Sequence, residues 1–372
     1  MRASGKVLVV GGGIAGSSAA IALRQQGIAV DVVEKYLPDA VLGIGINLQG
    51  NALRALAGLG VLDEIARAGF SYDGFAFFDS QGESRGTMPG PRAAGPDYPA
   101  MMGITRPDYS RILNRAVTAH GARIFPQTTV DALEQDANGV DVKFSDGRRE
   151  RYDAVVGADG IHSTTRSMIF GALGAPRYSG QAVWRANFPR SVDLLHSYDG
   201  GGGDRAGLAP LSDALMYMYV TDKSDTPEPP QGDLREKLRE KLAPYGGLIG
   251  QLREQLPPSE QIVWKPFLLV DLPNPWHNGR VIIIGDAAHA TTAHLGQGGA
   301  MAIEDAVVLG EELGNHDDVS DAFDAFMTRR FERTHKIQKW SEQLCRWEIT
   351  RSEDADQQGV IAQAFELVRQ PI

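Results

Sequence analysis

The feature that most constrains this chain is a glycine-rich turn between an apolar run and a helical pattern. Gly11-x-Gly13-x-x-Gly16 follows the apolar residues 7–10, and an alanine-rich stretch over 17–26 comes next. A continuous apolar run of this kind is typical of a strand buried on both faces of a parallel sheet. The order strand, glycine turn, helix therefore predicts an α/β unit on a parallel sheet.

The spacing of these glycines also favours a dinucleotide site. Gly11 permits a tight turn, Gly13 lets a pyrophosphate approach the backbone, and Gly16 allows close packing of helix on strand. A second strand, expected over 29–33, ends at Glu34, whose carboxylate can accept hydrogen bonds from ribose hydroxyls and repel a 2′-phosphate. The alternative is a plain tight turn with a surface glutamate. The pattern by itself does not separate FAD from NAD.

A second glycine turn lies near the other end of the chain. An apolar run over 281–284 leads into Gly285 and Asp286, and the glycines of 296–299 precede a helix expected over 300–313. A carboxylate at a strand end can bind a ribityl hydroxyl, and amides at a helix start favour negative charge on a reduced flavin. A strand, loop and helix with an ordinary glycine turn is the alternative.

Three motifs in one order make the chain similar to a known family. They are the fingerprint ending in Glu34, the run Asp153-Ala-Val-Val-Gly157-Ala-Asp159-Gly160-Ile-His162-Ser163-Thr-Thr-Arg166, and Gly285-Asp286-Ala-Ala-His289 with Gly296-Gln297-Gly298. The chain resembles the single-component, FAD-dependent aromatic hydroxylases of the para-hydroxybenzoate and salicylate hydroxylase type. It departs from them at Ala293, where the family usually has proline.

The resemblance implies a non-covalent FAD and assigns roles to residues of these motifs. Asp159 and Arg166 would serve the FAD pyrophosphate region and the use of NADH or NADPH. Asp286 would bind the ribityl chain or the diphosphate, and Arg106 or Arg111 the isoalloxazine or the diphosphate. The expected cofactor-binding residues are Gly11, Gly13, Ala15, Gly16, Glu34, Lys35, Arg106, Arg111, Val130, Asp159, Arg166, Asp286, Gly296, Gln297, Gly298 and Gly299.

The reaction is also implied by the resemblance. NADH or NADPH would reduce the flavin and leave, because the glycine run at 200–203 does not open a helix after a buried strand and offers no second fingerprint. Reduced flavin and O2 would form a C4a-hydroperoxyflavin that hydroxylates a small aromatic or heteroaromatic substrate. The cofactor carries this chemistry, so no catalytic acid or base is assigned.

The pattern of elements predicts a discontinuous architecture. The first part is a Rossmann-like, FAD-binding α/β domain with a mostly parallel sheet, and the second is a substrate domain with an antiparallel sheet. Helices are expected over 47–68 and 107–120. The expected ranges are 1–74, 101–170 and 276–320 for the FAD-binding domain, 75–100 and 171–275 for the substrate domain, and 321–372 for a C-terminal helical segment.

Candidate pocket residues lie on the expected strands of the substrate domain. Strand alternation would turn one set of side chains inward. Arg185 would bind a carboxylate or phenolate, and Tyr217 or Tyr219 a ring hydroxyl; a structural ion pair and plain core packing are the alternatives. Phe267 and His294 are further candidates for the pocket, although a solvent-facing histidine is the simpler interpretation of His294.

Composition narrows the function further. The 372 residues carry a net charge of −10 and no basic run, which argues against a nucleic-acid partner. Cys345 is the single cysteine, which fits a reducing compartment. No apolar stretch approaches the ~20 residues of a membrane span, and the first apolar run is too short for a signal segment. We expect a cytoplasmic protein, as a monomer or homodimer.

Three other functions stay open on these grounds. A halogenase or reductase of the same flavin fold is one, although the Trp-x-Trp-x-Ile-Pro motif of halogenases is absent. A NAD-dependent dehydrogenase is another, and it leaves the 285–299 segment unexplained. The third is a flavin-binding sensor without turnover.

Overall fold

The computed structural model describes residues 5–37, 44–200 and 204–372, and a six-stranded sheet carries the first glycine turn. Its order is β18-β19-β12-β1-β2-β8, with every neighbouring pair parallel except β18 and β19. The strands are β1 (Lys6–Val10), β2 (Ala29–Glu34), β8 (Arg123–Pro126), β12 (Ala154–Gly157), β18 (His277–Asn278) and β19 (Val281–Ile283). The predicted α/β class is confirmed. Of the glycine run at 200–203, only Gly200 lies within the described residues.

Alternating side chains of β1 pack into two different layers. Val7 and Val9 belong to a core built with the helices, whereas Leu8 and Val10 belong to a smaller core with the sheet β11-β10-β9. Burial on both faces explains the unbroken apolar run of this strand. The elements of these layers are α1 (Ile14–Gln25), α4 (Arg106–Ala119), α9 (Gly298–Asn315), β9 (Val130–Asp136), β10 (Gly139–Phe144) and β11 (Arg149–Tyr152).

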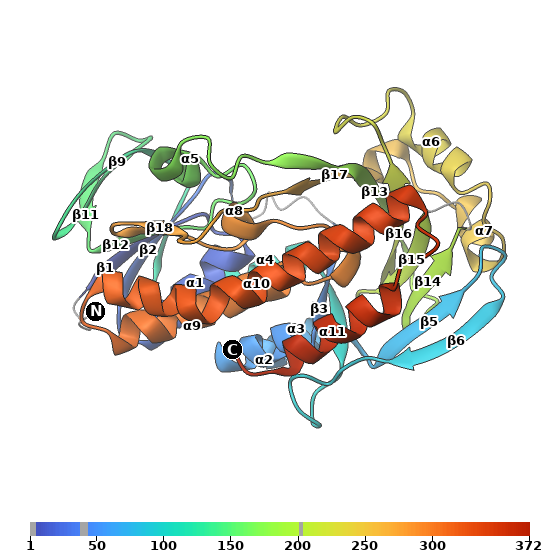
Figure 1. Ribbon diagram of the computed structural model, residues 1–372, viewed down its shortest axis with the longest axis horizontal. Coiled ribbons are helices and arrows are strands. Elements are labelled where there is room, and N and C mark those ends of the chain that lie inside the picture. The colour runs from blue at the N-terminus through green and yellow to red at the C-terminus, as the bar shows by residue number, and fades with distance from the viewer. Residues whose placement is uncertain (1–4, 38–43, 201–203) are drawn as a thin grey trace.

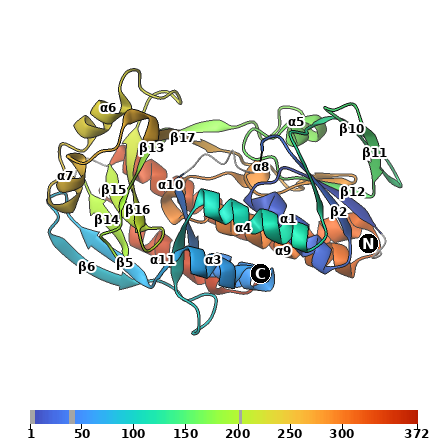
Figure 2. The ribbon, with the colours of Figure 1, turned by 180° about the vertical axis from the view of Figure 1, so that it is seen from behind.

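A seven-stranded sheet forms the other end of the molecule (Figure 2). Its order is β17-β13-β16-β15-β14-β5-β6, antiparallel except where β14 pairs with β5. The helices α6 (Leu234–Lys241) and α7 (Gly247–Arg253) cover one face through a shared hydrophobic core. The strands are β5 (Gly74–Phe78), β6 (Ser84–Pro89), β13 (Arg177–Pro189), β14 (Leu195–Asp199), β15 (Arg205–Pro210), β16 (Leu215–Lys223) and β17 (Val263–Leu269).

A separate three-stranded sheet, β3-β7-β4, packs its middle strand against β15 of the seven-stranded sheet. The prediction of helix from residue 47 onward is wrong at its start, because 45–49 pairs with β7 as an antiparallel strand and the helix begins at Gly50. A Cβ on Gly103 of β7 would lie 1.9 Å from the Pro210 carbonyl oxygen at the end of β15. The elements here are β3 (Gly45–Gln49), β4 (Phe70–Tyr72), β7 (Met101–Thr105), α2 (Gly50–Gly58) and α3 (Leu62–Ala68).

The long helix α10 (Val319–Thr350) runs from the six-stranded sheet toward the seven-stranded one (Figure 1). It contacts α9, α11 and β13. The remaining helical elements are α5 (Thr164–Phe170), α8 (Asp286–His289), α11 (Gln357–Arg369), η1 (Ser259–Gln261) and η2 (Ala293–Leu295). Within the described ranges no helix has the length and apolar character to cross a membrane. The division into domains stays a prediction.

Candidate functional site

The first glycine turn combines tight packing with open space. Gly11 has a φ of +104°, and its amide donates to the Val33 carbonyl at 2.8 Å. A Cβ on Gly16 would lie 1.8 Å from the Gly11 carbonyl oxygen, so the helix can pass this close only with glycine there. A Cβ on Gly13, in contrast, would meet no atom within 4 Å. The turn therefore leaves room for a group at Gly13 and at the start of α1.

Glu34 faces this turn from the end of β2. Its Oε2 accepts the Gly12 amide at 2.6 Å, and its Oε1 accepts the Tyr36 amide at 2.9 Å. Each carboxylate oxygen has a further lone pair, so both can still accept a hydroxyl. The Thr128 amide binds the Glu34 carbonyl at 3.0 Å, which brings the loop before Val130 beside the same strand end.

The second glycine turn lies against the first. Gly285 has a φ of +63°, and a Cβ on it would lie 2.8 Å from the Cβ of Ala15 in α1. Asp286 follows as an exposed side chain, and a Cβ on Gly298 would lie 4.0 Å from its Oδ1. No ion pair or hydrogen bond of the Asp286 carboxylate is found in the described part of the chain. An open glycine turn, a helix start and a free carboxylate thus fit a dinucleotide with a polyhydroxyl chain.

Asp159 and Arg166 have well-defined partners of their own. Asp159 accepts the Thr164 and Thr165 amides at 2.9 Å each, so it binds the first turn of α5 beside the N-cap residue Ser163. Arg166 is buried and donates to the Ala287 carbonyl at 2.7 Å and the Ile161 carbonyl at 3.0 Å. Burial lowers the pKa of Arg166, partly offset by Asp159. Arg166 therefore ties the Asp159 loop to α8 from a buried position.

Three further predicted cofactor residues, Arg106, Arg111 and Lys35, have exposed side chains. Arg106 is exposed at the start of α4, whereas Arg111, also exposed, pairs with Asp108 at 2.6 Å. Lys35 is exposed beyond the end of β2, and its ammonium group lies 5.5 Å from the centre of the Tyr36 ring. Of the two arginines, only Arg106 is left without a carboxylate partner among the described residues.

A second arginine of the candidate site, Arg185, lies on the seven-stranded sheet. Arg185 of β13 pairs in register with Tyr219 of β16, and Tyr217 lies one alternation further along the same face. Burial lowers the pKa of Arg185; Tyr217 counteracts this shift, and the positive charge of Arg106 adds to it. Arg185 forms no salt bridge within the described ranges. A half-buried guanidinium without a carboxylate partner is a candidate to bind an anionic ligand.

His294 and Phe267 contact each other at the edge of this region. Their ring centres are 5.9 Å apart in an edge-on arrangement. His294 Nδ1 is 3.0 Å from the Thr292 hydroxyl, and Nε2 is 3.5 Å from Glu348 of α10. Only 8% of the His294 side chain is exposed. The expectation of a solvent-facing histidine is wrong, because the ring packs between η2, β17 and α10.

Comparison with known proteins agrees with this geometry. A family model described as an FAD-binding domain matches residues 4–193 and 268–341. This chain belongs to that family. A 3-hydroxybenzoate 6-hydroxylase of Polaromonas naphthalenivorans is 32% identical over 89% of this chain and 85% of its own length. An FAD-dependent urate hydroxylase of Mycolicibacterium vanbaalenii is 30% identical over 94% and 89%.

The fold of this chain is also similar to that of a solved structure. The crystal structure of Klebsiella pneumoniae HpxO complexed with FAD and uric acid has a TM-score of 0.83 and 26% identity, and covers 98% of this chain and 92% of the other. The prediction of a flavin-dependent monooxygenase of the aromatic hydroxylase type is confirmed at the level of the family.

Two polar residues of the candidate site were not predicted from the sequence. Asn47 donates its Nδ2 to the Tyr217 hydroxyl at 3.1 Å, and the Tyr72 hydroxyl donates to Asn47 Oδ1 at 2.9 Å. Both come from the small sheet, whose first strand was expected to be helical. The alternation Ile46, Asn47, Leu48 was the available signal, since it follows a strand period better than a helical one.

Proposed function

We propose that this protein hydroxylates a small aromatic or heteroaromatic molecule that carries an acidic group, with FAD bound non-covalently and NADH or NADPH and O2 as co-substrates. The residues expected to hold FAD are those of the two glycine turns, with Glu34 near the ribose and Asp286 near the ribityl chain. Bound FAD would supply the redox chemistry and the activated oxygen. The side chains around it would position the ring and exclude water.

One observation carries the choice of substrate class: the polar groups of the proposed pocket are donors. Arg185 and Arg106 can only donate. The Tyr217 oxygen already accepts from Asn47, so its proton is the part left for a ligand. Burial raises the pKa of Tyr217 despite the nearby arginines, which keeps the phenol protonated at neutral pH. Such a set of donors fits a phenolate, enolate or carboxylate oxygen.

The first test is to purify the protein and record its flavin spectrum. Matched acidic and neutral aromatic compounds are then screened for stimulated NADH and NADPH oxidation, and products are analysed after incubation with 18O2. We expect bound FAD, stimulation by acidic rings, and one labelled oxygen atom in the product. A flavin-loaded protein that oxidises NAD(P)H without labelled product from any acidic ring would contradict the proposal.

A substitution tests the role of Arg185. Arg185→Met keeps most of the aliphatic stem but removes the charge, so the KM for an acidic substrate should rise on the order of tenfold to a hundredfold, as expected for a lost hydrogen bond to a charged group. FAD affinity should not change. Arg177→Met is a matched control, because Arg177 lies on the same strand and pairs with Glu342 at the surface.

The proposal also includes a cytoplasmic location, a monomeric or homodimeric state, and the domain ranges given above.

A further inference from the structure

The Gly296–Gly299 turn is held by side chains of a distant segment. Gln297 is 2% exposed, and its Oε1 accepts the Asn51 Nδ2 at 2.9 Å while its Nε2 donates to Asn51 Oδ1 at 3.2 Å. Gln49 donates to the Leu295 carbonyl at 2.6 Å and accepts from Gln297. Gln49, Asn51 and Gln297, here called the amide cluster, therefore fix the turn from both sides.

A buried carboxylate fixes the orientation of this cluster. Asn51 Nδ2 also donates to Glu304 Oε1 at 3.1 Å, and an ionised carboxylate can only accept. Glu304 is ionised because, although burial alone would raise its pKa, Arg330 and Arg333 outweigh this and lower the pKa. Glu304 thus determines which side of the Asn51 amide carries the nitrogen, and Asn51 in turn determines the orientation of the Gln297 amide.

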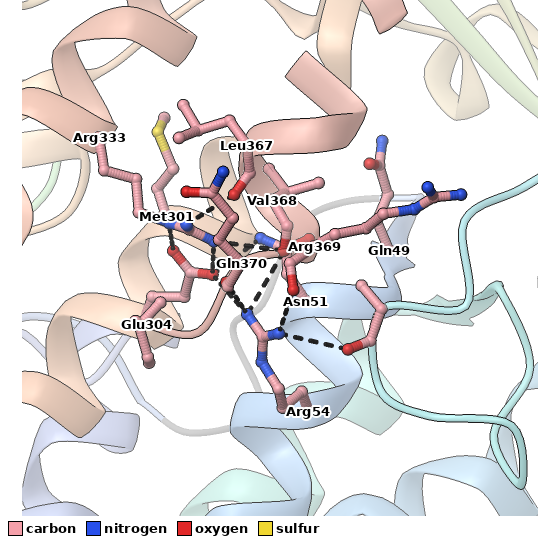
Figure 3. Close-up of polar contacts among 12 residues, drawn as sticks. Gln49, Asn51, Arg54, Met301, Glu304, Arg333, Leu367, Val368, Arg369 and Gln370 are labelled. Carbon is pink, nitrogen blue, oxygen red and sulfur yellow. Dashed lines mark hydrogen bonds and ion pairs between the residues drawn. The ribbon is translucent and has the colours of Figure 1, made fainter. Parts of the chain in front are cut away.

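The arginines beside Glu304 reach the last turn of α11 (Figure 3). Arg333 Nη2 is 3.0 Å from Glu304 Oε1, and Arg54 Nη2 is 3.8 Å from the same oxygen. Arg333 Nη1 donates to the Leu367 carbonyl at 2.7 Å, and Arg54 donates to the carbonyls of Val368, Arg369 and Gln370 at 3.3, 3.0 and 2.9 Å. These carbonyls lie at the C-terminal end of α11, where the backbone hydrogen bonds of a helix run out; the Leu367 carbonyl also accepts the Gln370 amide at 3.2 Å. Arg54 and Arg333 therefore act as a clamp on α11.

An apolar route joins the same two places. Leu295, directly before the turn, and Met301 of α9 lie in one buried cluster with Val360, Ala364 and Val368 of α11. Packed side chains in such a cluster cannot move independently. The glycine turn and α11 are consequently linked twice, through polar and through apolar contacts.

We propose that Asn51 and Glu304, with the Arg54–Arg333 clamp, are positioning residues that make FAD affinity depend on the docking of α11. The proposal rests on the proposed placement of the flavin at Gly296–Gly299. Because linkage between two sites is reciprocal, bound FAD must then stabilise α11 as much as α11 favours FAD. Without Asn51, α11 can dock while the turn loses its orientation.

The test combines FAD titration of the apoprotein, followed by flavin fluorescence, with hydrogen exchange measured with and without FAD. For wild type, FAD should slow amide exchange in α11 but not in α6, which lies on the far sheet. Arg54→Met and Asn51→Leu should each raise the Kd of FAD about fivefold or more, the lower end of typical coupling between sites. Asn51→Leu should also abolish the FAD-dependent protection of α11.

Arg369→Met is the matched control, because this exposed side chain on α11 pairs only with Glu366 among the described residues. It should leave the Kd of FAD unchanged. A purely structural role predicts lower unfolding temperatures of the apoprotein variants with an unaltered Kd, and that result would overturn the inference. If Asn51→Leu fails to fold, Arg54→Met and wild-type exchange decide the matter. A wild-type protein that takes up no FAD would instead defeat the proposed function.

Discussion

Glycines of the first turn differ in what a side chain would meet. At Gly16 the neighbour is the Gly11 carbonyl, part of the protein's own backbone, whereas at Gly13 no protein atom lies within 4 Å. Gly16 is therefore needed for the packing of the helix on the turn, and Gly13 leaves space for the pyrophosphate. The two requirements can be separated by mutation.

Gly13→Val should abolish FAD retention. The free energy of unfolding of the apoprotein should fall by only about 1 kcal/mol or less, because Gly13 is an N-cap residue with extended backbone. Gly16→Ala should destabilise the apoprotein by about 3 kcal/mol or more, because the helix must move away from the turn. Flavin absorbance after purification and urea unfolding of the apoproteins measure the two effects. A yellow Gly13→Val protein would contradict the placement of the pyrophosphate.

Glu34 should contribute to FAD affinity through its carboxylate. Glu34→Ala removes an acceptor of two backbone amides and of the proposed ribose hydroxyls, so the Kd of FAD should rise on the order of tenfold to a hundredfold. Fluorescence titration of the apoprotein with FAD measures this. Unchanged affinity would show that the ribose binds elsewhere.

Neighbouring strands shape the substrate side as a unit. The ring of Tyr219 in β16 lies over Gly207 in β15, where an added Cβ would come within 2.2 Å of the ring. The paired residues Gly207 and Tyr219 are thus matched across the two strands. Strand pairing, and not the tyrosine alone, determines where this ring lies.

Gly207→Ala should therefore displace the Tyr219 ring toward the proposed pocket. We expect the KM for substrate to rise on the order of tenfold, the cost of forcing a side chain off its rotamer, with the Kd of FAD unaltered. Gly58→Ala, where an added Cβ meets nothing within 4 Å, is the control. Equal KM values for both variants would argue against a pocket on this face.

Buried ion pairs connect α10 with α9 and with the second glycine turn. Arg330, fully buried in α10, binds Glu304 at 2.8 Å and Asp305 at 2.8 Å, and Asp305 in turn accepts the Gly285 amide and lies 2.5 Å from His289. Burial alone would raise the pKa of Asp305, but His289 and Arg330 lower it to about 2. The second glycine turn is thus anchored to α9 and α10 by an ionised carboxylate.

Acid should destabilise the protein through this carboxylate. Its folded pKa lies below the ordinary 3.8, so its contribution, on the order of 2 kcal/mol, is complete above about pH 4 and is lost as the pH falls toward about 2. Unfolding free energies of wild type and Asp305→Asn, measured across this range, should converge on acidification. Parallel pH profiles would show that Asp305 is not the group responsible.

The sequence by itself determined the α/β class, both glycine turns and the family, because glycine spacing and apolar runs act over a few residues. Only the tertiary structure decided which polar side chains meet. Arg330 and Arg333 of α10 point into the core, where Glu304 compensates their charge. Asn47 reaches Tyr217 across 170 positions of chain, and the strand that presents it exists because it pairs with β7. Local patterns carry no trace of such partners, since desolvated charges and amides are satisfied by whatever residue the packed fold brings within reach.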